Sequence, residues 1–337
     1  MNNTDSQIKL WRSTVVDTLT NSTESSVSSI SSNIVFSGAR QCISQALREF
    51  DMNRTDYVGI PDYSSHCVLD FVGRIATPVP LRLLPKDRAS AILLYDQWGW
   101  EKSVSARFEI TNEYEDVNII WDRVDSLPIS YQLIAENDQH QADAQIFSLK
   151  KTLNGFGGGL LWMRDNEDFH KTTSNDKALV IELFDIVRRL NDQELIKRKI
   201  NRFICGECDI NLDLVDWLDK CDLDHLSLQE HSARRARIDI CVNNLGQEKL
   251  PEWMQHQIEN YDMPAPGIWP LVVNIDSNDL IYEISKLFNF ETRFYHFNFN
   301  NSYLYPKWTK VLALPLHSEL SKEVLSEFFF FIRDFLY

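Results

Sequence analysis

Basic residues, cysteines and long hydrophobic runs are scarce in this sequence, and each scarcity excludes something. The chain has 34 lysines and arginines against 49 aspartates and glutamates, which gives a net charge of −15. A surface of that sign repels phosphate groups, so bulk electrostatic binding to nucleic acid or to an anionic membrane is excluded. The six cysteines are scattered over 337 residues, which favours reduced thiols over a disulfide framework.

Hydrophobic runs are short throughout the chain. The longest, such as 91–95 and 328–332, fall far below the roughly 20 residues that cross a bilayer. Residues 1–7 are polar and no apolar segment follows them, so the N-terminus does not resemble a signal peptide. We therefore expect a cytoplasmic protein without membrane association.

The N-terminal region has an unusual composition. Residues 20–33 read TNSTESSVSSISSN and contain only two apolar residues. Such a stretch buries too little surface to order itself, so we interpret it as an arm after a short helix at about 8–19. The predicted domains are this helix and arm (1–33), a large domain (34–200), and a helical segment with a small C-terminal domain (201–337).

Short apolar runs alternate with helical patterns in the predicted large domain. The predicted strands are 57–60, 81–84, 91–95 and 117–121, and the predicted helices are 42–50 and 65–75. This alternation predicts a largely parallel sheet with helices on both faces. Ligands of such sheets bind at the carboxyl ends of the strands.

The C-terminal part mixes helical and strand patterns. Its predicted elements are helices at 177–198 and 211–245, a strand at 269–275, a helix at 278–288, a strand at 311–314 and a closing helix from Ser321. The last four of these elements form a mixed segment of strand and helix patterns.

Two polar segments near predicted strands are candidates for ligand binding. Ser37, Gly38 and Ala39 form a turn into a helix, where backbone N–H groups can bind an anion, although most such turns are ordinary helix caps. Asp122 follows a strand directly, where a carboxylate can pair with a bound cation or simply cap a helix.

A third segment carries lysines between a strand and a glycine-rich turn. Ser148 is followed by Lys150 and Lys151, and then by glycines at 155 and 157–159. A lysine in a partly enclosed site can form a Schiff base with an aldehyde, whereas most single lysines are solvated surface residues. Together, a phosphate site, a strand-end acid and a lysine are the groups that pyridoxal 5′-phosphate (PLP) requires.

The order of these segments resembles the DegT/StrS-type nucleotide-sugar aminotransferases, which are fold type I PLP enzymes. The matching segments are 37–50, 59–67, 77–81, 119–122, 147–159 and 311–321. The most specific are Ser-x-x-Lys at 148–151 and Leu-Pro-Leu-His at 314–317. The resemblance implies a mainly parallel seven-stranded sheet flanked by helices, a smaller C-terminal α/β domain, and a homodimer.

The resemblance also implies roles for individual residues. Lys151 would form the Schiff base and move protons, with Lys150 as its competitor, because the family's spacing from the serine favours Lys151. Asp122 would hold the pyridinium nitrogen of the cofactor. The residues that would bind its phosphate are Ser37, Gly38, Ala39 and Ser148.

Two further positions predicted to contact PLP depart from the family pattern. Asp125 stands where the family has a Gln or His that donates a hydrogen bond to the cofactor's phenolic oxygen, and a carboxylate donates only when protonated. His66 lies in the region where the family stacks an aromatic ring on the pyridine, and of the two residues there only His66, unlike Ser65, has a ring to stack.

One segment also has metal-ligand spacing. Cys205, Cys208, Cys221 and His225 fit a CCCH zinc pattern. The same segment is rich in aspartate and partly helical, so reduced cysteines in a helical region are our default interpretation, and we predict no metal site.

The resulting hypothesis is a PLP-dependent aminotransferase. Glutamate would convert PLP to pyridoxamine phosphate (PMP), which would aminate a keto sugar linked to a nucleotide, in the biosynthesis of a cell-surface polysaccharide or a deoxyamino sugar. One alternative is another PLP-dependent reaction on a sugar, such as dehydration. The other is a degenerate, non-catalytic homologue that acts as a binding or scaffold protein.

Overall fold

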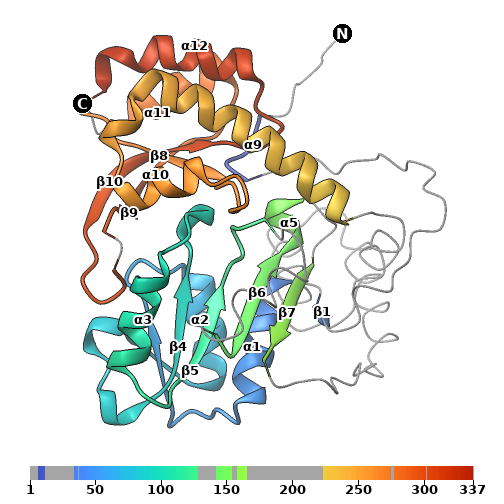
Figure 1. Cartoon of the computed structure of the whole chain (residues 1–337), viewed down its shortest axis with the longest axis vertical. Helices are drawn as coiled ribbons and strands as arrows, with labels where there is room; N and C mark the ends of the chain where they lie inside the picture. Colours follow the sequence, from blue (N-terminus) through green and yellow to red (C-terminus); the bar gives the residue numbers. More distant parts are fainter. Residues whose placement is uncertain are drawn as a thin grey trace, which may run out of the picture.

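A computed structural model describes residues 7–11, 34–36, 38–127, 142–153, 158–164, 223–274, 277–300 and 302–336. These residues form two lobes (Figure 1): a large lobe around a seven-stranded sheet and a small lobe around a three-stranded sheet. In this part of the chain, no helix has both the length and the apolar character that a membrane span requires.

The large sheet is mainly parallel, as the sequence predicted. Its strands, in spatial order, are β1 (Ile34–Phe36), β7 (Gly159–Met163), β6 (Ala144–Ser148), β5 (Asn118–Asp122), β4 (Ala89–Tyr95), β2 (Tyr57–Ile60) and β3 (Thr77–Pro80). All pairs from β6 to β3 are parallel. Strand β7 runs antiparallel to both of its neighbours.

Helices cover both faces of this sheet. The apolar faces of α1 (Ala39–Glu49) and α2 (His66–Ile75) pack on one side, against a cluster that includes Leu93. On the other side, α3 (Val104–Glu113) packs against Ile92. Successive residues of β4 therefore face opposite clusters, so the strand is buried on both sides, which explains its continuous apolar sequence.

Within the described ranges, the small lobe contains an antiparallel sheet and four α-helices. Its strands, in spatial order, are β8 (Ile268–Leu271), β10 (Trp308–Pro315) and β9 (Phe294–Asn298). Its helices are α9 (Leu223–Leu245), α10 (Glu252–Glu259), α11 (Asn278–Phe288) and α12 (Lys322–Ile332). The buried apolar side chains of these elements form one core cluster.

The two lobes meet at residues 96–103, which follow β4 and which we call the joint loop. Gln257 of α10 is fully buried against it. The side chain of Gln257 accepts a hydrogen bond from the backbone N–H of Glu101 (2.9 Å) and donates to the carbonyl oxygens of Gly99 (2.8 Å) and Pro264 (2.7 Å). One side chain thus ties the small lobe to the edge of the large sheet.

Most predicted elements match the structure, and two do not. The predicted strand at 81–84 is a 3₁₀ turn, because Pro80 and Pro85 flank it and its buried leucines, Leu81 and Leu84, are three residues apart. Ile8 begins no helix but forms an isolated β-bridge with Phe290. The predicted helix at 177–198 and the domain boundary at residue 200 lie outside the described residues.

Candidate active site

Three parallel strands end side by side and bring predicted residues together. Asp122 is the last residue of β5 and pairs in register with Tyr95 of β4 and Ile146 of β6. Ser148 ends β6, and Lys151 lies in the short helix α5 (Leu149–Thr152) that follows. The carboxyl edge of the sheet thus collects an acid, a hydroxyl and an amine, as the parallel topology requires.

Lys151 forms an ion pair with Asp125 at this edge. Its Nζ lies 2.8 Å from Oδ1 of Asp125, and the two side chains are 39% and 14% exposed. Burial alone lowers the pKa of Lys151, but the carboxylates of Asp125 and Asp122 outweigh it and hold this pKa above its ordinary value. In this geometry Lys151 is an ammonium.

Asp122 is a buried carboxyl group whose charge is only partly compensated. Its side chain is 5% exposed, and Oδ1 accepts a hydrogen bond from the backbone N–H of Val124 (3.1 Å). Burial raises the pKa of Asp122 to about 6, Lys151 opposes that rise, and Asp125 adds to it. A cationic ring nitrogen placed against Asp122 would stabilise its charged form.

A close backbone approach brings the predicted phosphate-binding residues together. Gly38 is the N-cap of α1, and Gly159 of β7 pairs with Ser148. A Cβ atom on Gly159 would lie only 2.4 Å from the backbone nitrogen of Ala39, so no other residue fits there without movement of α1. Ser148 caps α5 by accepting a hydrogen bond from the backbone N–H of Lys151 (3.3 Å). Ser37 lies outside the described residues.

The first turn of α1 supplies the donors of this cradle. The N–H of Gly38 already donates to the side chain of Gln41 (3.0 Å). The N–H groups of Ala39 and Arg40 have no acceptor within the helix, because they lie in its first turn. An anion bound here would meet these N–H groups and the positive end of the helix dipole.

His66 is the first residue of α2 and is exposed, and its predicted role stays a prediction. Its neighbour Cys67 lies near enough to Lys151 to contribute to raising the pKa of the amine. The thiol of Cys67 is 2.9 Å from the hydroxyl of Ser65, the N-cap of α2. The start of α2 therefore borders the site.

Sequence reasoning missed Trp11. The Nζ atom of Lys151 lies 4.8 Å from the centre of the Trp11 ring, within the range of a cation–π contact. The only signal in the sequence is a large aromatic residue within the predicted helix at 8–19, and no pattern there points to a lysine 140 positions away.

The small lobe holds the Trp11 segment in place. The backbone of Ile8 donates to the carbonyl of Asn289 (2.8 Å) and accepts from the N–H of Glu291 (2.6 Å). His317, in the Leu-Pro-Leu-His segment, donates from Nε2 to the carbonyl of Lys9 (2.8 Å). Leu10 is buried in the core of the small lobe.

Two tryptophans of the joint loop, Trp98 and Trp100, are buried in the protein. Trp100 is fully buried and donates from its indole to the carbonyl of Ile268 (2.9 Å). Trp98 stacks on Phe297 with ring centres 5.3 Å apart, and its backbone N–H donates to the side chain of Asp125 (3.2 Å).

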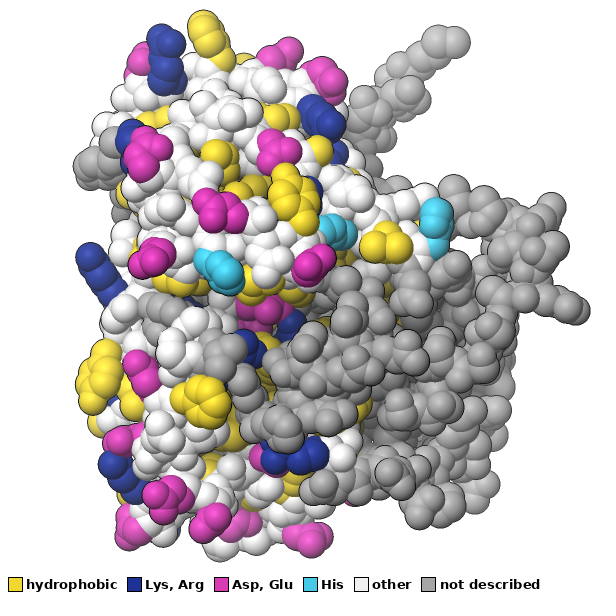
Figure 2. Space-filling view, viewed as in Figure 1, with side chains coloured by type: hydrophobic (Ala, Val, Ile, Leu, Met, Phe, Trp, Pro, Cys, Tyr) yellow, Lys and Arg dark blue, Asp and Glu magenta, His cyan; other side chains and the backbone are white. Residues whose placement is uncertain are grey.

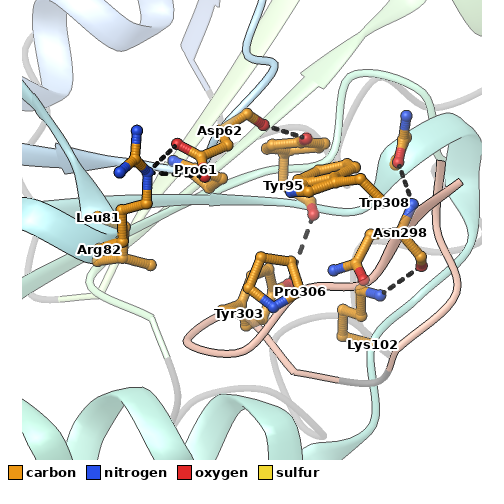
Figure 3. A pocket seen from close by; sticks show the side chains of 11 residues that line it. Pro61, Asp62, Leu81, Arg82, Tyr95, Lys102, Asn298, Tyr303, Pro306 and Trp308 are labelled. Atoms are coloured by element: carbon orange, nitrogen blue, oxygen red, sulfur yellow. Dashed lines mark hydrogen bonds and ion pairs between the residues drawn. The ribbon is translucent and has the colours of Figure 1, made fainter. Parts of the chain in front are cut away.

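A narrow cleft lies beside this edge, between the large sheet and the β9–β10 hairpin (Figure 3). It encloses only about 20 Å³, about the room for one water molecule. The Tyr95 hydroxyl donates to the carbonyl of Asp62 (3.2 Å). Residues lining the cleft include Asp62, Arg82, Tyr95, Lys102, Tyr303 and Trp308.

Most of the CCCH pattern lies outside the described residues. Cys205, Cys208 and Cys221 lie outside them, and the described His225 has its ring nitrogen 2.7 Å from the side-chain nitrogen of Gln229. Within the ranges that the structure covers, no group of three potential ligands could hold a metal ion.

The residues at the sheet edge fit PLP by the chemistry of their donors. The cradle beside Gly159 suits the phosphate, the buried carboxyl of Asp122 suits the pyridinium nitrogen, and Lys151 suits the aldehyde. These three groups lie on adjacent strands or on the helix turns that follow them.

Comparison with known proteins supports this assignment of the cofactor. The sequence matches the family described as "Putative PLP-dependent aminotransferase" over residues 23–332. No curated protein matches it.

Solved structures with a similar fold are distant in sequence. They include "Putative sugar aminotransferase Spr1654" of Streptococcus pneumoniae in its PMP form (14% identity, TM-score 0.54, 90% of this chain and 85% of that one). NtdA of Bacillus subtilis with bound PMP is 16% identical (TM-score 0.54, 90% and 73%). The methionine aminotransferase YbdL of Escherichia coli is 14% identical (TM-score 0.52, 90% and 77%). These likenesses show a shared fold, and the family match extends over nearly the whole chain: it belongs to the family of PLP-dependent aminotransferases.

Proposed function

We propose that the protein transfers an amino group from glutamate to a keto sugar linked to a nucleotide, through PLP and PMP. The observation that carries the proposal is the convergence of Lys151, Asp122 and Ser148 at one sheet edge. The sugar substrate is supported by the DegT/StrS-like segments of the sequence, and one structural neighbour is described as a sugar aminotransferase.

Each residue has a definite task in this proposal. Asp122 holds a proton on the ring nitrogen of the cofactor, which makes the bound ring an electron sink. Ser37, Gly38, Ala39 and Ser148 hold the phosphate. Lys151 binds the aldehyde and, once released, carries a proton to and from the reacting carbon of the substrate.

The surroundings of the site suit a sugar substrate. Tyr63, which precedes α2 in the large lobe, is exposed and stacks on His296 of the small lobe with ring centres 4.4 Å apart. Aromatic faces of this kind pack well against the apolar faces of sugars. Figure 2 shows acidic side chains spread over both lobes, which agrees with a small-molecule substrate rather than nucleic acid.

The first test of the proposal is the visible absorbance of the purified protein. Attached PLP absorbs at wavelengths where plain protein does not, so the protein should be coloured, or become coloured on addition of PLP. Glutamate should then bleach the colour and release 2-oxoglutarate. A colourless protein that stays colourless with PLP would support the scaffold alternative, and colour that glutamate leaves unchanged would support dehydration or a related reaction.

Matched variants identify the lysine. Lys151→Ala should abolish the visible band, whereas Lys150→Ala should keep it, because Lys150 is exposed on the same short helix while the amine of Lys151 pairs with Asp125. Reduction with borohydride followed by peptide mass spectrometry should place the cofactor on residue 151. Its attachment to residue 150 would contradict the assignment.

The proposal also includes assembly and location. We propose a cytoplasmic homodimer, which sedimentation equilibrium would detect as a mass twice the 39.3 kDa of one chain. A monomeric mass in the presence of PLP would contradict the dimer.

A further inference from the structure

Both oxygens of the Asp125 carboxylate are bound by groups of this chain. Oδ1 pairs with Nζ of Lys151 at 2.8 Å, and Oδ2 accepts a hydrogen bond from the backbone N–H of Trp98 at 3.2 Å. A carboxylate held on one oxygen by a backbone donor presents the other in a fixed direction. The Nζ atom of Lys151 is therefore held in a defined position by a direct contact with Asp125, in addition to the attraction from the other acidic groups nearby.

The joint loop fixes the position of this carboxylate. Trp98 has φ 62° and Gly99 has φ 82°, so the loop turns in the left-handed region at two successive residues. A Cβ atom on Gly99 would lie 2.9 Å from the carbonyl oxygen of Asp125. A tryptophan in this conformation is strained by roughly 1–3 kcal/mol, and such strain persists where the surroundings require it. Here it aims the N–H of Trp98 at Asp125.

The remaining neighbours of Lys151 leave Asp125 as its direct partner. Asp122 acts from the end of β5 but makes no hydrogen bond to the amine, and Cys67 acts from the start of α2. Tyr95 ends β4 beside both acids. Trp11 offers only its ring face. Among the described residues, the groups that shift the pKa of Lys151 are Asp125, Asp122 and Cys67, and Asp125 is the one at contact distance.

We propose that Asp125 is a positioning residue that binds protonated Lys151 whenever this lysine is not attached to the cofactor. The inference rests on the proposed function, because it takes Lys151 as the cofactor lysine. A protonated amine has no free electron pair, so it must leave Asp125 and lose its proton before it can bond to an aldehyde. In the reverse direction, Asp125 receives the ammonium that the departing lysine becomes.

The test measures the reactivity of Lys151 in the full-length protein freed of PLP. An amine-acylating reagent is applied across a range of pH, and peptide mass spectrometry quantifies modification at residues 150 and 151. The variants are Asp125→Asn, which keeps an oxygen for the Trp98 N–H but removes the charge, and Asp125→Glu, which keeps the charge. Lys150 is the internal control.

In Asp125→Asn, Lys151 should be modified about tenfold faster at pH 8 than in the wild type, because loss of a contacting opposite charge lowers a lysine pKa by at least about one unit. Modification of Lys150 should not change. The visible band of attached PLP should appear at a pH about one unit lower. Asp125→Glu should restore at least part of the wild-type rate.

Several outcomes would overturn the proposal. One is a pH profile of Lys151 modification that is unchanged in Asp125→Asn. Another is a wild-type profile in which the modification rate of Lys151 reaches half of its maximum below pH 10; this measurement does not depend on the folding of any variant. If the Lys151 profile shifts as expected but no protein gains a visible band, the ion pair stands and the proposed function fails. If PLP attaches normally but the pH of attachment is unchanged in Asp125→Asn, the function stands and the positioning role fails.

Discussion

Asp122 illustrates what the site demands of a single residue. Folding has removed its carboxyl group from water, and burial raises its pKa to about 6. Because the unfolded group titrates near 4, the folded protein binds the extra proton between about pH 4 and 6. The charge of Asp122 therefore destabilises the cofactor-free protein as the pH rises through this window, and it remains destabilising at neutral pH.

Asp122→Asn should reveal this effect. Without PLP, the variant and the wild type should have similar free energies of unfolding near pH 4, and the variant should be more stable at pH 8 by on the order of 2 kcal/mol. Urea unfolding at several pH values measures the difference. The variant should also bind PLP more weakly, because its amide gives the ring nitrogen no charge. A stability difference that does not grow between pH 4 and 8 would contradict the buried-charge argument.

For single residues, the sequence was sufficient to predict those site residues that lie at or just after the end of a strand. Asp122, Ser148 and Lys151 come at or just after β5 and β6, and parallel strands bring such residues to one edge. The ion pair of Lys151 with Asp125 and the contact with Trp11 depend on how distant segments pack. Periodicity carries no information on such contacts, so they required the structure.

At the scale of elements, the antiparallel strand β7 shapes the phosphate cradle. It lies between β1 and β6 and brings Gly159 against the first residue of α1. The glycine-rich stretch was recognised in the sequence, but the partner of its close approach was not, because Ala39 is 120 positions away. The predicted helix at 278–288 and the one after Ser321 were confirmed, since both have clear caps and apolar faces.

Gly159→Ala tests the cradle. The added Cβ would overlap the backbone of Ala39, so the variant should lose about 1–3 kcal/mol of stability and bind PLP at least tenfold more weakly. Gly73→Ala is the matched control: in α2 its nearest neighbour would be 4.0 Å away, and alanine should stabilise the helix by up to about 1 kcal/mol. Equal effects of the two substitutions on PLP affinity, measured by titration of the visible band, would refute the cradle.

At the scale of the whole molecule, Gln257 connects the small lobe to the joint loop, and through it to Trp98 and Asp125. The sequence pattern predicted the largely parallel sheet, and the resemblance to the DegT/StrS-type enzymes implied the smaller C-terminal α/β domain. The contact between Gln257 and the joint loop could not be predicted, because nothing in the sequence distinguishes a buried glutamine from a surface one.

Gln257→Ala should therefore affect the site as well as stability. It leaves two carbonyls and one N–H without their partner, so we expect a loss of about 2–4 kcal/mol in urea unfolding. PLP affinity should also fall, because the loop that holds Asp125 loses its support. Gln255→Ala, on the same helix, removes one hydrogen bond within the small lobe, to the carbonyl of Leu250. It should reduce stability by about 1 kcal/mol and leave PLP affinity unchanged.

The anchoring of the Trp11 segment has a consequence for the order of events during synthesis. Lys151, Asp125 and the cradle emerge from the ribosome early, but Trp11 is held by Asn289, Glu291 and His317, and the joint loop by Gln257. All four of these residues come after Lys151 in the chain and are therefore made later. A growing chain therefore has its reactive lysine before it has the parts that enclose it, and secure capture of the cofactor has to wait until these later segments are made.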